Sequence, residues 1–268
     1  MPDMFMQLLP LLIAGAVAGF LAGLLGIGGG IVTIPALFVA FESLNVPLEW
    51  RMHAAIATSL TIIDATNASS VWAHHKKGGV DWNIVKDWWW AILVGALAGS
   101  FFARELKTEQ LIYLFAVLAG LLALKMLLPI DKLQLGERLP GGFFRFFNPA
   151  VIGFLSALKG IGGGSYSVPY MTIYGVPIHR AVGTAALAGI VISVSGGLGY
   201  LLGGWNIAGL PDGMAGFIHL HSAAIVAISA IVMAPIGAKV AHAIPKTVLS
   251  IIFGLFLVLA TTRLLMSV

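Results

Sequence analysis

The sequence contains no cysteine and few charged residues. The absence of cysteine among 268 residues excludes disulfide bonds, thiolate metal ligands and a cysteine nucleophile. Charged side chains make up 10% of the chain, whereas soluble proteins average about 25%. With 15 basic and 11 acidic residues, the chain cannot cover the surface of an aqueous domain of this length. The composition, 59% hydrophobic, therefore excludes a water-soluble globular protein and indicates that the lipid bilayer is the solvent.

Several functional signatures are also missing. The net charge of +4 is too dilute to indicate nucleic acid binding, so we expect no nucleic acid partner. No Lys or Arg precedes the first apolar run, and we expect no cleavable signal peptide. The sequence has no Walker-type phosphate loop, no H-E-x-x-H motif and no paired aspartate motif, so we expect neither an ATP-driven pump nor an enzyme with catalytic residues. The 7 histidines lack the spacing of metal ligands, and we expect neither a metal nor a cofactor.

Long apolar runs dominate what is present. Six of them have about 20 residues, the length that crosses a bilayer as a helix. They cover residues 54–73, 86–104, 109–128, 179–201, 217–241 and 245–264. Two further apolar stretches, 6–42 and 145–175, are each interrupted by glycines, which break helices. The sequence therefore predicts an all-α polytopic membrane protein with eight apolar segments in the conventional count.

The two interruptions are copies of one motif. Residues 26–35 and 160–169 share the pattern G-I-G-G-G-x-x-x-[IV]-P, and the copies start 134 residues apart, half of the 268-residue chain. A Val-Pro pair follows each copy, at Val46 and at Val176. We therefore predict two homologous repeats, 1–134 and 135–268, each a glycine-broken helical hairpin followed by three transmembrane helices.

The helices after the glycines are too short to cross the membrane. Each has about 11 or 12 residues, or about 17 Å, which is half of a hydrocarbon core of about 30 Å. A hairpin that turns back at the midplane leaves three crossings per repeat, an odd number that inverts the second repeat. This arrangement places 9 Lys and Arg on one face and 4 on the other, whereas eight full crossings divide them 7 to 6. The positive-inside rule therefore favours re-entrant hairpins with both termini outside, and fully spanning hairpins are the alternative.

Two symmetric breaks at membrane depth predict one central site, because irregular backbone is tolerated there only when protein buries it or when it lines a wet cavity. The N–H groups and positive dipole ends of the short helices favour an anion. The alternative is that the glycines only allow close helix packing. The predicted substrate-binding residues are Gly28, Gly29, Gly30, Thr33, Gly162, Gly163, Gly164, Ser165, Tyr166 and Ser167, with Thr58, Ser59, Thr184 and Ser193 as weaker candidates. For each hydroxyl the alternative is a bond to the preceding helical turn.

Two charged residues are not explained by topology. Lys159 directly precedes the second break, where a buried ammonium needs an anion or a wet path, and we predict that it binds substrate. Its alternatives are snorkelling to an interface or an ion pair with Asp64. Asp64 lies within the first crossing and shares a helix face with Asn67, so we predict that these two residues couple transport to protons. The alternative for Asp64 is a structural role beside Asn67 and Thr61.

These motifs resemble the sulfite exporter TauE/SafE family, also called the 4-toluene sulfonate uptake permeases. The resemblance rests on the paired glycine motifs, the Val-Pro pairs and an Ala-[IV]-[AG]-Thr stretch at 55–58 and 181–184, and it covers nearly the whole chain. It implies a carrier in the inner membrane of a bacterium or archaeon for small sulfur-containing anions such as sulfite or organosulfonates. The two copies differ here, because Ser165, Tyr166 and Ser167 replace Ile31, Val32 and Thr33.

The sequence therefore predicts a secondary transporter that exports such an anion, bound at the midplane between the two broken helices. The expected partners are the anionic substrate, the lipid bilayer and a further copy of the chain in a homo-oligomer. The alternative function is an anion channel with the same site.

Overall fold

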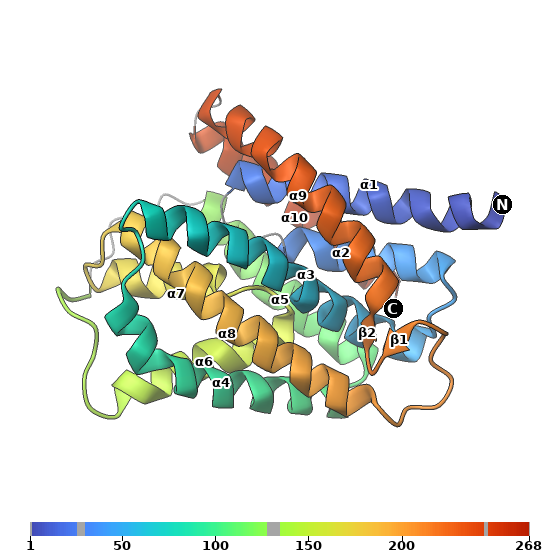
Figure 1. Ribbon diagram of the computed structural model, residues 1–268, viewed down its shortest axis with the longest axis horizontal. Helices are drawn as coiled ribbons and strands as arrows, with labels where there is room; N and C mark the ends of the chain where they lie inside the picture. Colours follow the sequence, from blue (N-terminus) through green and yellow to red (C-terminus); the bar gives the residue numbers. More distant parts are fainter. Residues whose placement is uncertain (1, 26–29, 128–134, 244–245, 268) are drawn as a thin grey trace.

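A computed structural model describes residues 2–25, 30–127, 135–243 and 246–267, and its secondary structure is almost entirely helical (Figure 1). The helices are α1 (Pro2–Leu25), α2 (Gly30–Ser43), α3 (Leu48–Lys76), α4 (Trp82–Glu105), α5 (Thr108–Leu127), α6 (Phe144–Lys159), α7 (Gly164–Ile173), α8 (Ile178–Gly204), α9 (Leu220–Ala243) and α10 (Lys246–Leu265). Two short strands, β1 (Met214–Ala215) and β2 (Ile218–His219), pair in antiparallel fashion before α9. The predicted helical class is therefore confirmed.

Both glycine motifs separate two helices, as predicted. The first hairpin is α1 and α2, and the second is α6 and α7, close to the predicted ranges 6–42 and 145–175. The short helices α2 and α7 end in the same way, with the N–H of Val46 donating to O of Phe41 and the N–H of Val176 donating to O of Met171. These bonds close each helix before the Val-Pro pair.

One predicted helix begins later than its apolar run. The prediction placed a helix from residue 217, but residues 218–219 form β2 and α9 begins only at Leu220. Gly213 and Gly216 have φ angles of +87° and +55°, which fold the chain into the short hairpin. Hydrophobicity alone did not show this turn, because the strand residues are as apolar as the helix that follows.

The two helical hairpins open at opposite ends of the bundle. The start of α1, the α2–α3 loop and the end of α10 lie at one end, which we call the termini end (Figure 1). There Nε2 of His53 lies 3.0 Å from O of Ala103 and from O of Leu106. The α3–α4 loop, residues 135–143 and the α7–α8 loop lie at the other end, which we call the linker end. There the N–H of Leu135 donates to O of Ile173 at 2.8 Å.

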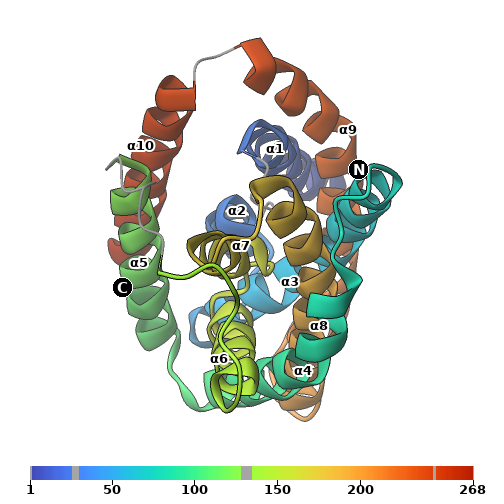
Figure 2. The same cartoon turned by 90° about the vertical axis from the view of Figure 1, so that its left-hand side faces the viewer.

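Helices from opposite halves of the chain pack in pairs whose order is reciprocal. α1 lies along α9 and α6 lies along α4, while α3 packs against α8 and α5 against α10 (Figure 2). Glycines allow the first two contacts, because a Cβ on Gly19 would lie 2.3 Å from O of Ala230 and one on Gly153 would lie 2.4 Å from O of Ile92. At these two positions, which lie outside the two breaks, glycine therefore allows close packing of helices.

Within the residues that the structure describes, two helices are long and apolar enough by themselves to cross a membrane. They are α8, over Ile178–Gly204, and the part of α9 over Leu220–Gly237. Shorter apolar helices within the described residues include Gly30–Ser43 of α2 and Thr108–Leu121 of α5. The core follows α2 and α3, where Ile34, Leu37 and Leu60 are fully buried.

Candidate functional site

The start of α2 lies against the second break. The first residue of α2, Gly30, lies against the second break, because a Cβ there would be 2.8 Å from O of Gly160 and 3.0 Å from Cα of Ile161. The hydroxyl of Ser59 on α3 donates to O of Gly160 at 3.1 Å and fixes the same segment. Gly28 and Gly29 lie outside the described residues. The structure thus brings the start of α2 to the end of α6, although their motifs lie half a chain apart.

The second break turns the chain between two helices. α6 ends at Lys159, and Gly160 has φ +66° and ψ +29°, a left-handed conformation that favours glycine. α7 begins at Gly164, and its first regular bond is the N–H of Ser167 donating to O of Gly163 at 2.8 Å. The N–H groups of the first turn of α7 have no acceptor within the helix, so this end is suited to negative charge.

Lys159 is the most unusual residue at this site. Its side chain is 1% exposed, and its Nζ has no hydrogen-bond partner among the described residues. The Nζ lies over the ring of Tyr166, 5.3 Å from the centroid. Among the described residues it forms no ion pair, so the alternative pairing with Asp64 is not present. Its burial also excludes snorkelling to an interface. A buried ammonium without a counter-charge is costly in free energy and calls for an anion.

Four hydroxyls near Lys159 in sequence are also buried and have no partner in the described part of the chain. They belong to Ser156 on α6 and to Ser165, Tyr166 and Ser167 on α7. Elsewhere in the protein, the hydroxyls of Ser195 and Ser229 donate to backbone carbonyls of the preceding helical turn. The hydroxyls beside the break do not do so, which argues against that alternative for them. Most buried polar groups in proteins are satisfied, so a cluster of orphaned donors indicates a binding site.

Ser156 was missed from the sequence. It precedes Lys159 by three residues and shares its helix face, and it is fully buried. The signal available was this spacing. A lone serine in an apolar helix gives no other indication, because such residues commonly bond their own helix.

Asn67 and Asp64 lie on α3 but face different partners. Asn67 is buried, and its Nδ2 has no hydrogen-bond partner. A Cβ on Gly162 would lie 3.3 Å from this nitrogen, which places Asn67 at the second break. Asp64 is half-buried and accepts a hydrogen bond from Ser193 on α8. The prediction grouped both residues for coupling, and the structure brings only Asn67 next to the break glycines.

The remaining predicted residues have different surroundings. Thr33 is buried in the first turns of α2. A Cβ on Gly163 would lie 3.2 Å from N of Gly189, so this glycine permits close approach of α8. Thr58 and Thr184 have structural partners: the N–H of His219 donates to Oγ1 of Thr58 at 3.1 Å, and the N–H of Asp81 donates to Oγ1 of Thr184 at 2.9 Å. Each threonine thus holds the start of a helix from the other half.

We expect Thr58→Val and Thr184→Val to lower stability rather than substrate affinity. Each change leaves a buried backbone N–H without its acceptor, at a cost of about 1 kcal/mol. Thermal unfolding of the purified variants measures this cost. Thr66→Val is the control, since Thr66 only bonds O of Ile63 in its own helix. Weaker substrate binding at unchanged stability would instead place these threonines in the binding site.

Comparison with known proteins gives one consistent result. Residues 11–264 match the family described as Sulfite exporter TauE/SafE. A probable membrane transporter protein of Haemophilus influenzae is 32% identical over 98% of this chain and 100% of its own length. A probable membrane transporter protein of Methanocaldococcus jannaschii is 29% identical, over 95% of this chain and 97% of its own. No solved structure matches the chain.

The match covers both breaks and nearly every described helix, and the relatives extend over the same length. The resemblance seen in the motifs is thereby confirmed, and the protein is an integral membrane protein with a transport function. The chain belongs to the sulfite exporter TauE/SafE family.

Proposed function

We propose that the protein is a secondary transporter that exports a small sulfur-containing anion, either sulfite or an organosulfonate. The observation that carries this proposal is the buried Nζ of Lys159, which has no partner among the described residues and lies over the ring of Tyr166, one of the residues at the second break whose hydroxyls are also orphaned. An oxyanion would supply a counter-charge to Lys159 and acceptors to these donors at once. The family name supports the sulfur-containing class.

The chemistry of the site favours binding that can be reversed. One ammonium balances a single negative charge, and neutral hydroxyls and helix N–H groups add directional bonds without further charge. A carrier must release its substrate, so a site with a single cation suits turnover better than a cluster of several cations would. The tyrosine ring of Tyr166 against Nζ of Lys159 also limits the space on one side of the ammonium.

Alternating access follows from the symmetry that we infer between the halves. Reciprocal packing of α1 on α9 and of α6 on α4, together with the reciprocal threonine bonds, supports inverted repeats at 1–134 and 135–268. The hairpins open at opposite ends, so each can close the site from one side. We further propose that the helices cross the inner membrane of a prokaryotic cell several times, with both termini outside, as the distribution of Lys and Arg favours.

Transport in proteoliposomes tests the proposal. Purified protein is reconstituted, and uptake of labelled sulfite or taurine is measured with and without the same unlabelled anion inside. A transporter saturates and shows counterflow. An anion channel, the alternative function, shows neither. Thermal stabilisation by sulfite, sulfoacetate or taurine, compared with sulfate, thiosulfate and halides, identifies the anion, because a ligand that binds only the folded state raises its stability.

We expect Asp64→Asn to remove the dependence of transport on the proton gradient. Asp64 is the half-buried carboxylate that joins α3 to α8 through Ser193, the helix pair at the centre of the bundle. The amide keeps a hydrogen bond to Ser193 but cannot take up a proton. Uptake is compared at equal pH and with an inward pH gradient, with Asp212→Asn as an exposed control. Proton coupling that survives in Asp64→Asn excludes this role.

A further inference from the structure

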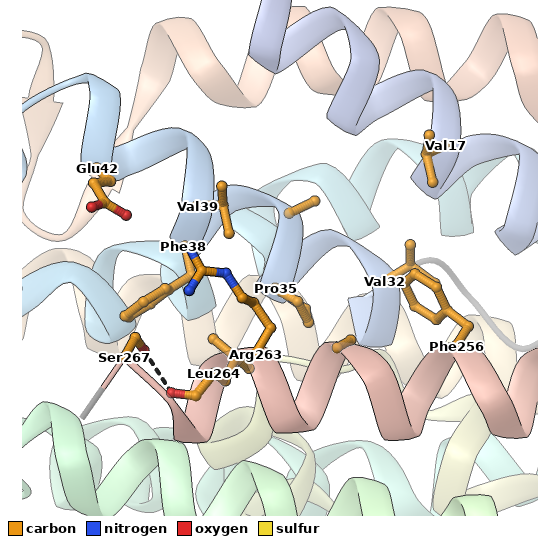
Figure 3. A pocket seen from close by; sticks show the side chains of 12 residues that line it. Val17, Val32, Pro35, Phe38, Val39, Glu42, Phe256, Arg263, Leu264 and Ser267 are labelled. Carbon is orange, nitrogen blue, oxygen red and sulfur yellow. Dashed lines mark hydrogen bonds between the residues drawn. The ribbon is translucent and has the colours of Figure 1, made fainter.

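A second feature of the molecule lies away from the breaks, in a groove between α1, α2 and α10. The groove has a volume of about 220 Å³ (Figure 3). Its walls are Val17 of α1, six residues of α2 (Val32, Pro35, Ala36, Phe38, Val39 and Glu42) and five from α10 and its end (Phe256, Ala260, Arg263, Leu264 and Ser267). Val17 and Val39 are more than two-fifths exposed, so the groove opens on the outer face of the bundle.

The groove changes from apolar to charged along its length. Val32 and Phe256 line one end, near the start of α2 (Figure 3). Glu42, Arg263 and Ser267 line the other end, where α2 and α10 both finish. α2 has 14 residues and is about 21 Å long, so the groove runs from the level of the breaks to the termini end. An apolar run of this length with a polar end has the polarity of one leaflet of a membrane.

The charges at this end are open to a ligand. Arg263 is exposed and forms no ion pair with any described residue. The side chain of Glu42 is 63% exposed, and its carboxylate lies 3.7 Å from Arg51, which flanks the groove from α3. Two guanidinium groups and one carboxylate thus stand at the same end. Arg263 has no ion-pair partner among the described residues and can contact a phosphate, and the exposed side of Glu42 can contact an ammonium.

The equivalent end of the second hairpin is covered by the chain itself. The N–H groups of Leu135 and Gly136 donate to O of Ile173, at 2.8 and 3.3 Å, and Glu137 packs against Gly175. The linker between the halves thereby closes the end of α7. Among the described residues no such segment lies over the end of α2, so the first hairpin keeps this surface open.

We propose that this groove binds one phospholipid whose headgroup carries both charges, as phosphatidylethanolamine does. One acyl chain lies between α2 and α10, the phosphate contacts Arg263, and the ammonium contacts Glu42. The surrounding lipid is as apolar as the groove, so the acyl chain by itself gives little preference. The headgroup contacts therefore determine which lipid binds, and the site is independent of the anion site at the breaks.

Binding of defined lipids to delipidated full-length protein tests this proposal. Native mass spectrometry in detergent gives the affinity for phosphatidylethanolamine and for phosphatidylglycerol of the same acyl chains. We expect phosphatidylethanolamine to bind at least tenfold more tightly, Glu42→Gln to remove most of this preference, and Arg263→Gln to weaken binding of both lipids. Arg104→Gln, an exposed arginine near the end of α4, is the matched control and is expected to bind as the unchanged protein does.

A second pair of variants tests the groove itself. Ala260→Trp fills the groove and is expected to lower affinity for phosphatidylethanolamine at least tenfold, whereas Val258→Trp places the same ring on the exposed face of α10 and is expected to have no effect. Equal binding of the two lipids, or full binding by Ala260→Trp, overturns the proposal. Dimers that Ala260→Trp alone disrupts, without any retained lipid, would also overturn it, since a second copy would then occupy the groove.

Discussion

Lys159→Met is expected to abolish saturable anion transport while making the folded protein more stable. The ammonium is buried, and the described residues offer it neither a carboxylate nor a hydrogen-bond partner, so the empty site carries its desolvation cost uncompensated. Methionine fills a similar volume without that cost. The bound anion loses its only counter-charge, for which we expect a loss of about 3 kcal/mol, or about a hundredfold in affinity.

Two measurements on the same preparations separate this result from misfolding. Thermal unfolding gives the stability without ligand, and counterflow with the preferred anion gives transport. Lys107→Met, a change at an exposed lysine between α4 and α5, is the control and should alter neither. Lys159→Arg keeps the charge and is expected to retain part of the binding. Unchanged anion affinity in Lys159→Met would contradict the proposed role of this residue, as would a transport-competent protein of lower stability.

Part of the site could be predicted from the sequence because residues that are unfavourable in their surroundings are visible there. Lys159 was found because a charge in an apolar run conflicts with its surroundings, and the breaks were found because glycine triplets conflict with a helix. Both signals are local conflicts that can be seen without coordinates. Their juxtaposition in space could be predicted only from the symmetry argument, and the described residues show one part of it, the contact between Gly30 and Gly160.

Other features left no local signal. The hydrogen bonds to Thr58 and Thr184 join segments of opposite halves of the chain. The sequence around either threonine therefore could not predict these bonds. The pairing of β1 with β2 depends on two left-handed glycines rather than on hydrophobicity. The apolar runs located the helices but not their full lengths, since α3 covers Leu48–Lys76 where the run was 54–73. The partners of side chains could not be predicted, because they depend on packing between segments far apart in the chain.

Gly30→Ala is expected to have the second-largest effect, because it separates the two breaks. The added Cβ would lie 2.7 Å from Cδ1 of Ile63 and 2.8 Å from O of Gly160, closer than real contacts allow. The Ile63 side chain can rotate away, but the backbone of Gly160 is held by Ser59 and by the helix end of α6. We expect a stability loss of about 2 kcal/mol or more, and transport well below that of the unchanged protein.

Two further glycine variants test whether the loss of stability follows the closeness of the contacts that the added Cβ makes. Gly162→Ala meets only the side chains of Ile63 and Asn67, at 2.9 and 3.3 Å, so a smaller loss is expected. Gly197→Ala in α8 meets nothing within 4 Å and is expected to stabilise the helix by up to about 1 kcal/mol, with normal transport. Thermal unfolding and counterflow of all three variants check the order. If Gly30→Ala had the stability and transport of Gly197→Ala, the contact between Gly30 and Gly160 would not be required for the anion site. The orphaned donors around Lys159 would then bind the anion without a contribution from α2.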